Sequence, residues 1–233
     1  MSITLPNERM LIVALGLCLS VLGIFALLSE TSQRRPVGAI DTDRLAAIAS
    51  NTDRPGLSTA SQLGFLFECR RAMTSIVGRA QPSSLRDEVS RSCLNSALEM
   101  TTRSPTFSVA WLTAAVAAVQ LRDWPAFERS IEKSYITGAN EQWVAELRVD
   151  LVSDHRDRLD EALLSAHRAD LILLLSHDRG RQFLADRYVA LTAFRDEIDT
   201  ILPSLDESVS RRFLNLAERR EVRRQRQIDA QTR

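Results

Sequence analysis

Lysine and aromatic residues are scarce in this chain. Lys133 is the one lysine among 233 residues, and Phe, Trp and Tyr together make up 6%. The chain has no net charge, because 30 basic residues balance 30 acidic residues. It therefore has no long-range electrostatic field that would attract nucleic acid, and we expect no nucleic-acid partner. Glycine occurs eight times and β-branched runs are few, whereas Ala, Leu, Arg and Glu are abundant. This composition predicts an all-α protein.

Motifs that carry catalysis are also missing. The sequence contains no G-x-S-x-G, no phosphate-binding glycine loop and no dinucleotide-binding fingerprint. Its histidines, His155, His167 and His177, fall in or near helix ends and polar segments, without a second histidine or cysteine at metal-ligand spacing. We therefore expect neither an enzyme nor a cofactor or metal site. An envelope hydrolase, the catalytic alternative, would need a deep cleft with converging acids of perturbed pKa.

One apolar segment near the start of the chain indicates the cellular setting. Residues 10–28, MLIVALGLCLSVLGIFALL, carry no charge, and 19 residues at a helical rise of about 1.5 Å just cross a hydrocarbon core of roughly 30 Å. A cleaved signal peptide would have a shorter apolar region and small residues at the cut site, which the exit from Phe25 to Glu30 lacks. We predict an uncleaved transmembrane anchor, with a cleaved signal peptide as the alternative.

This anchor divides the chain into five expected segments. They are an N-terminal flank over 1–9, the anchor over 10–28, a linker over 29–58, a helical-hairpin domain over 59–203, and a basic helix with a tail over 204–233. Arg9 and the terminal amine precede the anchor, whereas Arg34 and Arg35 follow it. The positive-inside rule therefore slightly favours a cytoplasmic C-terminal side.

A pair of cysteines gives the opposite indication. Cys69 lies on a helix expected from Thr59 to about Val77, and Cys93 lies on the next helix, which Ser84 could cap. Each cysteine is twelve positions from Gln81 in the intervening turn, so the two face each other in an antiparallel hairpin. A disulfide between them would require an oxidising compartment and would place the domain in the bacterial periplasm. Two reduced core cysteines are the alternative.

Aromatic residues mark the helices in the middle of the chain. Ser104-Pro105 has the form of a helix start, and the turn at 122–125 breaks the chain before a second helix. A further helix begins 32 residues after the first tryptophan. Each aromatic falls on the stripe that its own helix must bury, so we expect four core anchors: Trp111, Trp124, Tyr135 and Trp143.

These features resemble the tetratricopeptide repeat family, in which a tryptophan early in one helix, an Asp-aromatic turn and a second helix return after about 34 residues. The resemblance covers residues 105–139, about one repeat. It departs from the family pattern at Ala114, Phe127 and Ala139. It implies an antiparallel helical-hairpin solenoid, and an irregular helical bundle is the alternative. With its anchor, the layout is also similar to that of membrane-anchored helical accessory proteins of bacterial surface-polysaccharide assembly systems.

Arginine dominates the end of the chain. Ser204 to Glu207 predicts a capping box for a last helix. Its later arginines could contact anionic lipid head groups, an anionic polymer or an acidic partner surface. A solvated helix that frays into a tail is the alternative. The candidate contact residues are Arg219, Arg220, Arg223, Arg224 and Arg226.

These observations predict a non-catalytic adaptor or scaffold of the bacterial cell envelope, held in the inner membrane by a single span with its domain in the periplasm. The expected partners are the bilayer and another envelope protein, one that makes or exports surface polysaccharide. Tethering would raise the local concentration and so strengthen weak contacts with that partner. The competing prediction is a module that binds an anionic glycan or lipid directly through its arginines.

Overall fold

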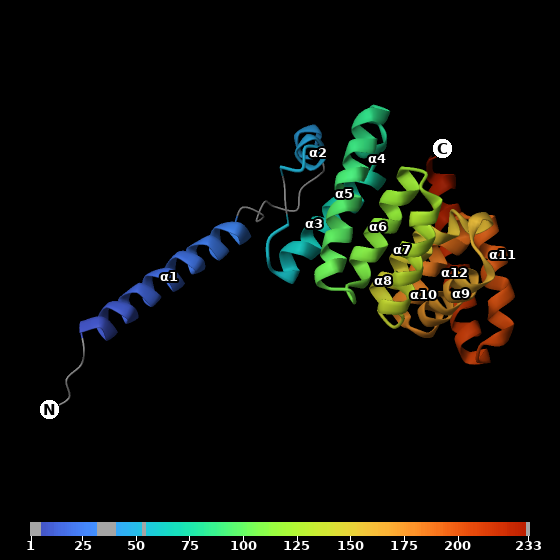
Figure 1. The fold of residues 1–233 in the computed structure, drawn as a ribbon. Coiled ribbons are helices and arrows are strands. Elements are labelled where there is room, and N and C mark those ends of the chain that lie inside the picture. The colour runs from blue at the N-terminus through green and yellow to red at the C-terminus, as the bar shows by residue number, and fades with distance from the viewer. Residues whose placement is uncertain (1–5, 32–40, 53–54, 232–233) are drawn as a thin grey trace.

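Helices make up almost all of the computed structural model, which describes residues 6–31, 41–52 and 55–231, with side chains from 10–28, 41–52 and 55–231 (Figure 1). No strand occurs in these ranges, so the all-α prediction is confirmed for them. The helices are α1 (Pro6–Thr31), α2 (Thr42–Ala49), α3 (Thr59–Thr74), α4 (Ile76–Arg79), α5 (Ser83–Arg103), α6 (Ser108–Gln120), α7 (Trp124–Thr137), α8 (Gln142–Ser153), α9 (Glu161–Ser176), α10 (Asp178–Ala190), α11 (Thr192–Ile201) and α12 (Glu207–Gln231). Two short 3₁₀ turns are η1 (Arg156–Arg158) and η2 (Leu202–Ser204).

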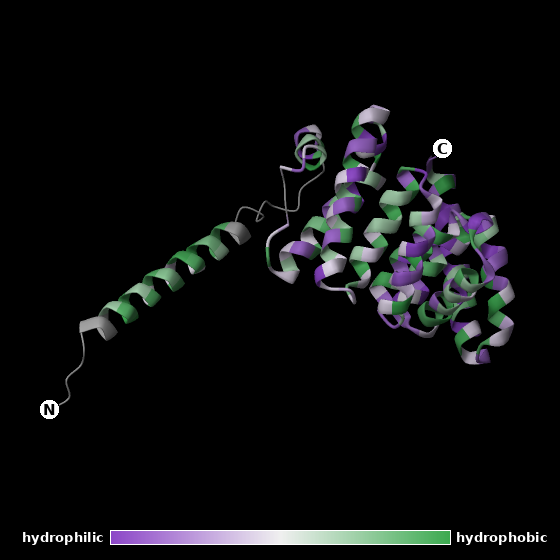
Figure 2. Ribbon diagram, in the orientation of Figure 1, coloured by the Kyte–Doolittle hydropathy of each residue, from purple (hydrophilic) through white to green (hydrophobic). Residues whose placement is uncertain are grey.

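The helix α1 contains the predicted anchor and stands apart from the others (Figure 1). All side chains from Met10 to Leu28 are exposed, and Figure 2 shows apolar residues along the whole stretch, unlike the mixed surfaces of the other helices. Within the described ranges it is the one helix that is long and apolar enough to cross a membrane. Arg34 and Arg35, on which the orientation argument rests, lie outside the described residues.

The helical domain begins earlier than the sequence predicted. Asp41 caps α2 by accepting a hydrogen bond from the amide of Arg44 at 2.8 Å, and Leu45 and Ile48 are buried against the first hairpin. Residues 41–52 are therefore part of the folded domain, although they fall inside the predicted linker. A helix of eight residues with two buried apolar side chains is too short to give a clear periodic pattern.

The first hairpin consists of α3, α4 and α5. The helix predicted to run to Val77 ends at Thr74, because the Ser75 hydroxyl accepts a hydrogen bond from the Gly78 amide at 3.1 Å and starts α4. A Cβ on Gly78 would lie 1.8 Å from the Ala72 carbonyl oxygen, so only glycine fits this reversal. The predicted Ser84 cap is wrong, since α5 begins at Ser83 after Pro82 without a side-chain cap.

At the centre of the domain lies α6, in contact with α3, α5, α7 and α8. Every residue from Ser108 to Ala118 except Trp111 is buried, and the alanines allow the neighbouring backbones to approach closely. Trp111 is half-buried and donates its indole N–H to the Pro105 carbonyl at 2.8 Å. Its prediction as a core anchor is wrong, because α6 buries nearly its whole circumference and leaves Trp111 on the one open face.

The C-terminal helices α8 to α12 surround a second apolar core, and α10 packs on α9, α11 and α12. Phe213 and Ala217 bury one face of α12 against this core, so the first part of the predicted C-terminal segment belongs to the domain. The predicted Ser204 capping box is wrong, because the Asp206 carboxylate instead accepts a hydrogen bond from the Ser208 amide at 2.8 Å.

Candidate functional site

A buried ion pair fixes the centre of the C-terminal half. The guanidinium of Arg148, on α8, has no exposed surface, and its Nε and Nη2 each donate to the Asp170 carboxylate of α9 at 2.7 Å. Its Nη1 donates to the Ser134 carbonyl at 3.0 Å and to the Ser134 hydroxyl at 3.5 Å, and its Nη2 also donates to the Gly138 carbonyl at 3.0 Å. Both carbonyls lie at the end of α7 and each also accepts a backbone amide, from Gly138 at 3.0 Å and from Glu141 at 3.2 Å. Arg148 therefore joins α7, α8 and α9.

The ion pair belongs to a wider polar cluster. Burial raises the pKa of Asp170, and the two hydrogen bonds and the charge of Arg148 oppose that rise. Burial also raises the pKa of Tyr135, which lies under the Arg148 guanidinium at 4.8 Å. His167 on α9 is almost fully buried, with its Nε2 at 3.2 Å from Glu197 Oε1 of α11. This cluster ties four helices together, and its ion pair is buried away from solvent, so we assign it a structural role.

Two grooves on the surface are large enough to hold part of a partner. The first, here called the Trp124 groove, has a volume of about 610 Å³. It lies where the start of α5, the end of α6 and the start of α7 meet near His155. Its lining residues are Ser83, Arg86, Asp87, Val119, Gln120, Leu121, Arg122, Trp124 and His155.

A tight helix ending shapes the Trp124 groove. Arg122 adopts a left-handed conformation with φ of 59°, its amide donates to the Val119 carbonyl at 3.0 Å, and the Asp123 amide donates to the Ala118 carbonyl at 2.9 Å. This is the Schellman pattern, here with arginine where glycine is usual. Asp123 then caps α7 by accepting from the Ala126 amide at 3.0 Å. The turn places Arg122 on the groove lining.

Trp124 connects this turn to the loop after α8. The Arg158 guanidinium stacks over its ring at 4.1 Å, and the His155 ring meets it edge-on at 5.7 Å. Trp124 is half-buried and packs against the core around Phe127, as predicted in part, but its second surface lines the groove. A half-buried aromatic side chain on a groove lining is typical of a binding surface.

The charges in the Trp124 groove favour an acidic or polar occupant. Arg86 and Arg122 outnumber Asp87, and the first amides of α5 lack a side-chain cap. A helix start of this kind carries a partial positive charge. The groove thus suits a carboxylate-bearing segment of another molecule.

The second groove, here called the Tyr135 groove, lies between α7 and α9 and has a volume of about 420 Å³. Tyr135 is buried, as predicted for a core anchor, and it also lines this groove. The full lining is Glu128, Arg129, Glu132, Tyr135, Ile136, Asp160, Ala162, Leu163 and Ala166. Its polar residues are mainly acidic, so the two grooves differ in charge.

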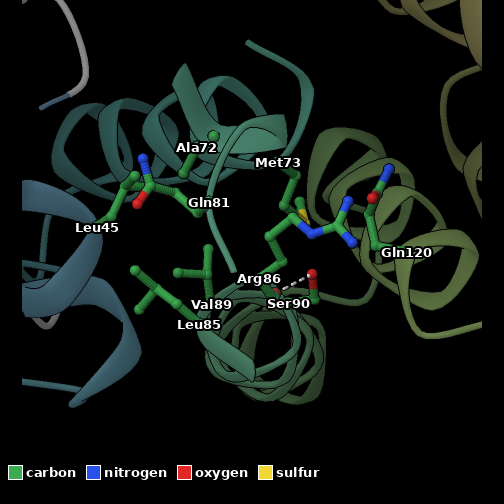
Figure 3. Close-up of a pocket in the computed structure, with 10 residues that line it drawn as sticks. Leu45, Ala72, Met73, Gln81, Leu85, Arg86, Val89, Ser90 and Gln120 are labelled. Atoms are coloured by element: carbon green, nitrogen blue, oxygen red, sulfur yellow. Dashed lines mark hydrogen bonds between the residues drawn. The ribbon is translucent and has the colours of Figure 1, made fainter. Parts of the chain in front are cut away.

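A third hollow lies where α2 meets the first hairpin, and it is too small for a ligand. Figure 3 shows Leu85 and Val89 of α5 on the same side of the hollow as Leu45 and Gln81, with the Arg86 side chain passing Met73 of α3 toward Gln120. The space inside amounts to about 10 Å³, room for about one water molecule. It is a packing defect under α2.

The structure brings Cys69 and Cys93 together as a disulfide with a Cα–Cα distance of 5.7 Å. Both residues are fully buried, so the disulfide prediction is confirmed and the reduced alternative is not. Trp143, the last predicted core anchor, is half-buried against the domain core and lies 5.9 Å from the Phe67 ring. Neither contact brings a reactive group into a groove.

The predicted arginines of the last helix divide into two groups. Arg220 pairs with Asp186 at 3.2 Å and Arg224 donates to the Val189 carbonyl, so both hold α12 against α10. Arg219, Arg223 and Arg226 are exposed and form no ion pair within the described part of the chain. Only this second group is available to an outside partner.

The sequence prediction missed the most buried charges of the molecule. Arg148 shares the buried face of α8 with Val144 and Val152, and Asp170 shares that of α9 with Leu171 and Leu174. A charged residue within an apolar stripe on each of two helices was the available signal. His167 lies in mid-helix, which corrects its expected place near a helix end.

Within the described ranges, no group of three or more His, Cys, Asp or Glu side chains is placed to hold a metal ion. Comparisons of the chain with protein-family models, with curated proteins and with solved structures found no match.

Proposed function

We propose that this protein is a non-catalytic adaptor of the bacterial cell envelope, tethered to the inner membrane by α1. The observation that supports this most directly is the contrast between α1, whose 19 uncharged residues from Met10 to Leu28 are all exposed, and the compact domain that follows. An exposed apolar helix of this length suits a hydrocarbon environment. A disulfide-closed domain on a membrane tether suits the periplasm, because disulfides persist in oxidising compartments.

The order of helix packing supports a solenoid of the tetratricopeptide kind. α6 packs on both helices of the preceding hairpin and on α7, and α8 packs on both α6 and α9. Stacked hairpins of this type present grooves between helices to partner segments. The resemblance in layout to polysaccharide-assembly accessory proteins further favours a partner that makes or exports surface polysaccharide.

We place the partner contact in the Trp124 groove. Its half-open tryptophan ring supplies apolar area, and Arg86, Arg122 and the uncapped start of α5 supply positive charge. An acidic segment of an envelope protein fits both features. Because single exposed charge contacts are weak, confinement to the membrane would provide the effective concentration that the contact needs.

Site-specific photocrosslinking in native membranes tests this proposal. A crosslinking residue at Arg122, in the groove, should form an adduct with another envelope protein, whereas one at Asn95, on an exposed face of α5, should not. The double variant Leu19→Arg/Leu22→Arg should raise the free energy of membrane insertion by about 2.5–3.5 kcal/mol per charge. This variant should be lost from carbonate-washed membranes and should form no adduct.

The matched variant Leu19→Ala/Leu22→Ala should remain in the membrane and keep the adduct. Wild-type protein recovered in the soluble fraction would contradict the tether. Equal adducts from positions 122 and 95 would contradict a specific groove contact.

The second candidate function is direct binding of an anionic glycan or lipid by the free arginines of α12. The exposure of Arg219, Arg223 and Arg226 favours it. Truncation of α12 would also remove Ala217 contacts, so Gln substitution of these three arginines is the cleaner change. On this function, flotation with anionic vesicles should drop in the Gln variant and in high salt. Unchanged flotation would exclude it, with Arg91→Gln on α5 as the control.

A further inference from the structure

The Tyr135 groove has the charge of a surface that receives a basic helix. Glu128, Glu132 and Asp160 line it against a single arginine, Arg129. No ion pair within the described residues involves any of these four side chains. The Asp160 carboxylate caps α9 by accepting a hydrogen bond from the Leu163 amide at 2.8 Å. The groove therefore carries uncompensated negative charge.

Apolar surface accompanies this charge. Ile136 lies at the groove with 64% of its surface exposed, and Leu163, Ala162 and Ala166 line the α9 side. The Tyr135 ring closes the floor, and its buried hydroxyl has no hydrogen-bond partner. An apolar strip flanked by carboxylates fits a helix that combines arginines with aliphatic side chains.

The same chain contains such a helix. From Glu221 to Gln231 every residue of α12 is exposed, and this part carries Arg223 and Arg226 beside the exposed Val222 and Ile228. Contacts of Arg220 and Arg224 with α10 hold the base of this segment in a fixed direction. The end of α12 is thus a helix with exposed aliphatic side chains and with two exposed arginines, Arg223 and Arg226, that form no ion pair within the described residues.

We propose that the Tyr135 groove receives the exposed end of α12 from a second copy of this chain. Within one copy α12 packs on α10, α9 and η2, and none of its arginines pairs with the groove acids, so the occupant must come from another molecule. The two surfaces are different patches, so the contact is heterologous and links copies in a row. Exposed ion pairs are individually weak, and the shared membrane confines the copies to one plane where they can associate.

Energy transfer between labelled full-length chains tests this contact. The chains would carry a donor or an acceptor fluorophore on the cysteine introduced by Ser2→Cys, in a Cys18→Ser background. They would be reconstituted in phosphatidylcholine vesicles, which contain no anionic lipid. Wild type should show transfer that excess unlabelled protein competes away. Glu128→Arg/Glu132→Arg and Arg223→Glu/Arg226→Glu should each weaken association about tenfold, because two favourable pairs become repulsive.

Charge complementation makes the experiment specific. Mixing the groove variant with the helix variant should restore transfer, since the reversed groove then faces the reversed helix and the intact groove of the helix variant faces the intact helix of the groove variant. Glu88→Arg and Arg91→Glu on the exposed face of α5 should leave transfer unchanged. Circular dichroism and an intact disulfide would show that all variants fold. Retained transfer in the groove variant, loss without recovery in the mixture, or no transfer in wild type would each overturn the proposal.

Discussion

Replacing Arg148 by methionine should lower the free energy of unfolding at neutral pH by about 3–5 kcal/mol, the usual cost of removing one partner of a buried ion pair. Asp170 would lose its Arg148 partner while remaining a buried carboxylate, and the Ser134 and Gly138 carbonyls would each lose one of their donors. Urea denaturation of the full-length protein in detergent, followed by circular dichroism, measures this change.

The loss should depend on pH in a defined direction. Burial raises the folded-state pKa of Asp170, and without Arg148 that pKa rises further. Between the ordinary value of 3.8 and the raised value, the folded protein binds more protons than the unfolded chain, so stability falls as pH rises. The difference between Arg148→Met and wild type should therefore be smallest near pH 4 and should grow toward neutral pH.

Two controls separate this effect from a general loss of charge. Arg103→Met breaks the exposed pair with Glu99, both partners of which are more than half exposed, and should cost less than about 1 kcal/mol. Arg148→Met/Asp170→Leu removes both buried charges and should recover part of the stability. An Arg148→Met protein as stable as wild type at neutral pH would refute the structural role of the pair.

Removing the disulfide should have the second-largest effect. Cys69→Ala/Cys93→Ala opens a loop whose ends are 24 positions apart, and the loss of this constraint on the unfolded chain corresponds to about 3 kcal/mol. Alanine leaves no unpaired hydroxyl in the buried site. The midpoint of urea denaturation under non-reducing conditions should shift downward, and a reductant should shift that of the wild type toward the same value.

Cys18→Ala is the matched control for the disulfide variant, because Cys18 is the free cysteine of the described chain and lies exposed on α1. It should leave the denaturation midpoint of the domain unchanged. Full stability of the double variant would show that Cys69 and Cys93 contribute only packing, and it would weaken the argument for an oxidising compartment.

Helix class, the apolar span and the cysteine pairing were all predictable, because each follows from local periodicity or symmetry about one turn. The hairpin geometry set Cys69 and Cys93 opposite each other without knowledge of any other contact. Helix starts were predicted poorly. Ser84, Ser104 and Ser204 each fitted the pattern of a helix start. In the structure, α5 instead follows Pro82, α6 follows Phe107, and Asp206 caps the first turn of α12.

The candidate site was less accessible to sequence reasoning, because it depends on which helices meet. Trp111 and Trp124 have similar local patterns, yet α6 is enclosed by four helices and turns only Trp111 outward. The pairing of Arg148 with Asp170 joins residues 22 positions apart on separate helices. The grooves likewise arise between helices, so their charge could be read only after the packing was known.

If α1 is the membrane tether proposed above, the docking of α2 limits the distance between the domain and the lipid surface. Only residues 32–40 separate the end of α1 from Asp41, and ten Cα–Cα steps reach about 35 Å at full extension. Had the predicted linker run unfolded to residue 58, this connection would have been nearly three times as long. For the proposed adaptor, such a short connection favours integral membrane partners over freely diffusing ones.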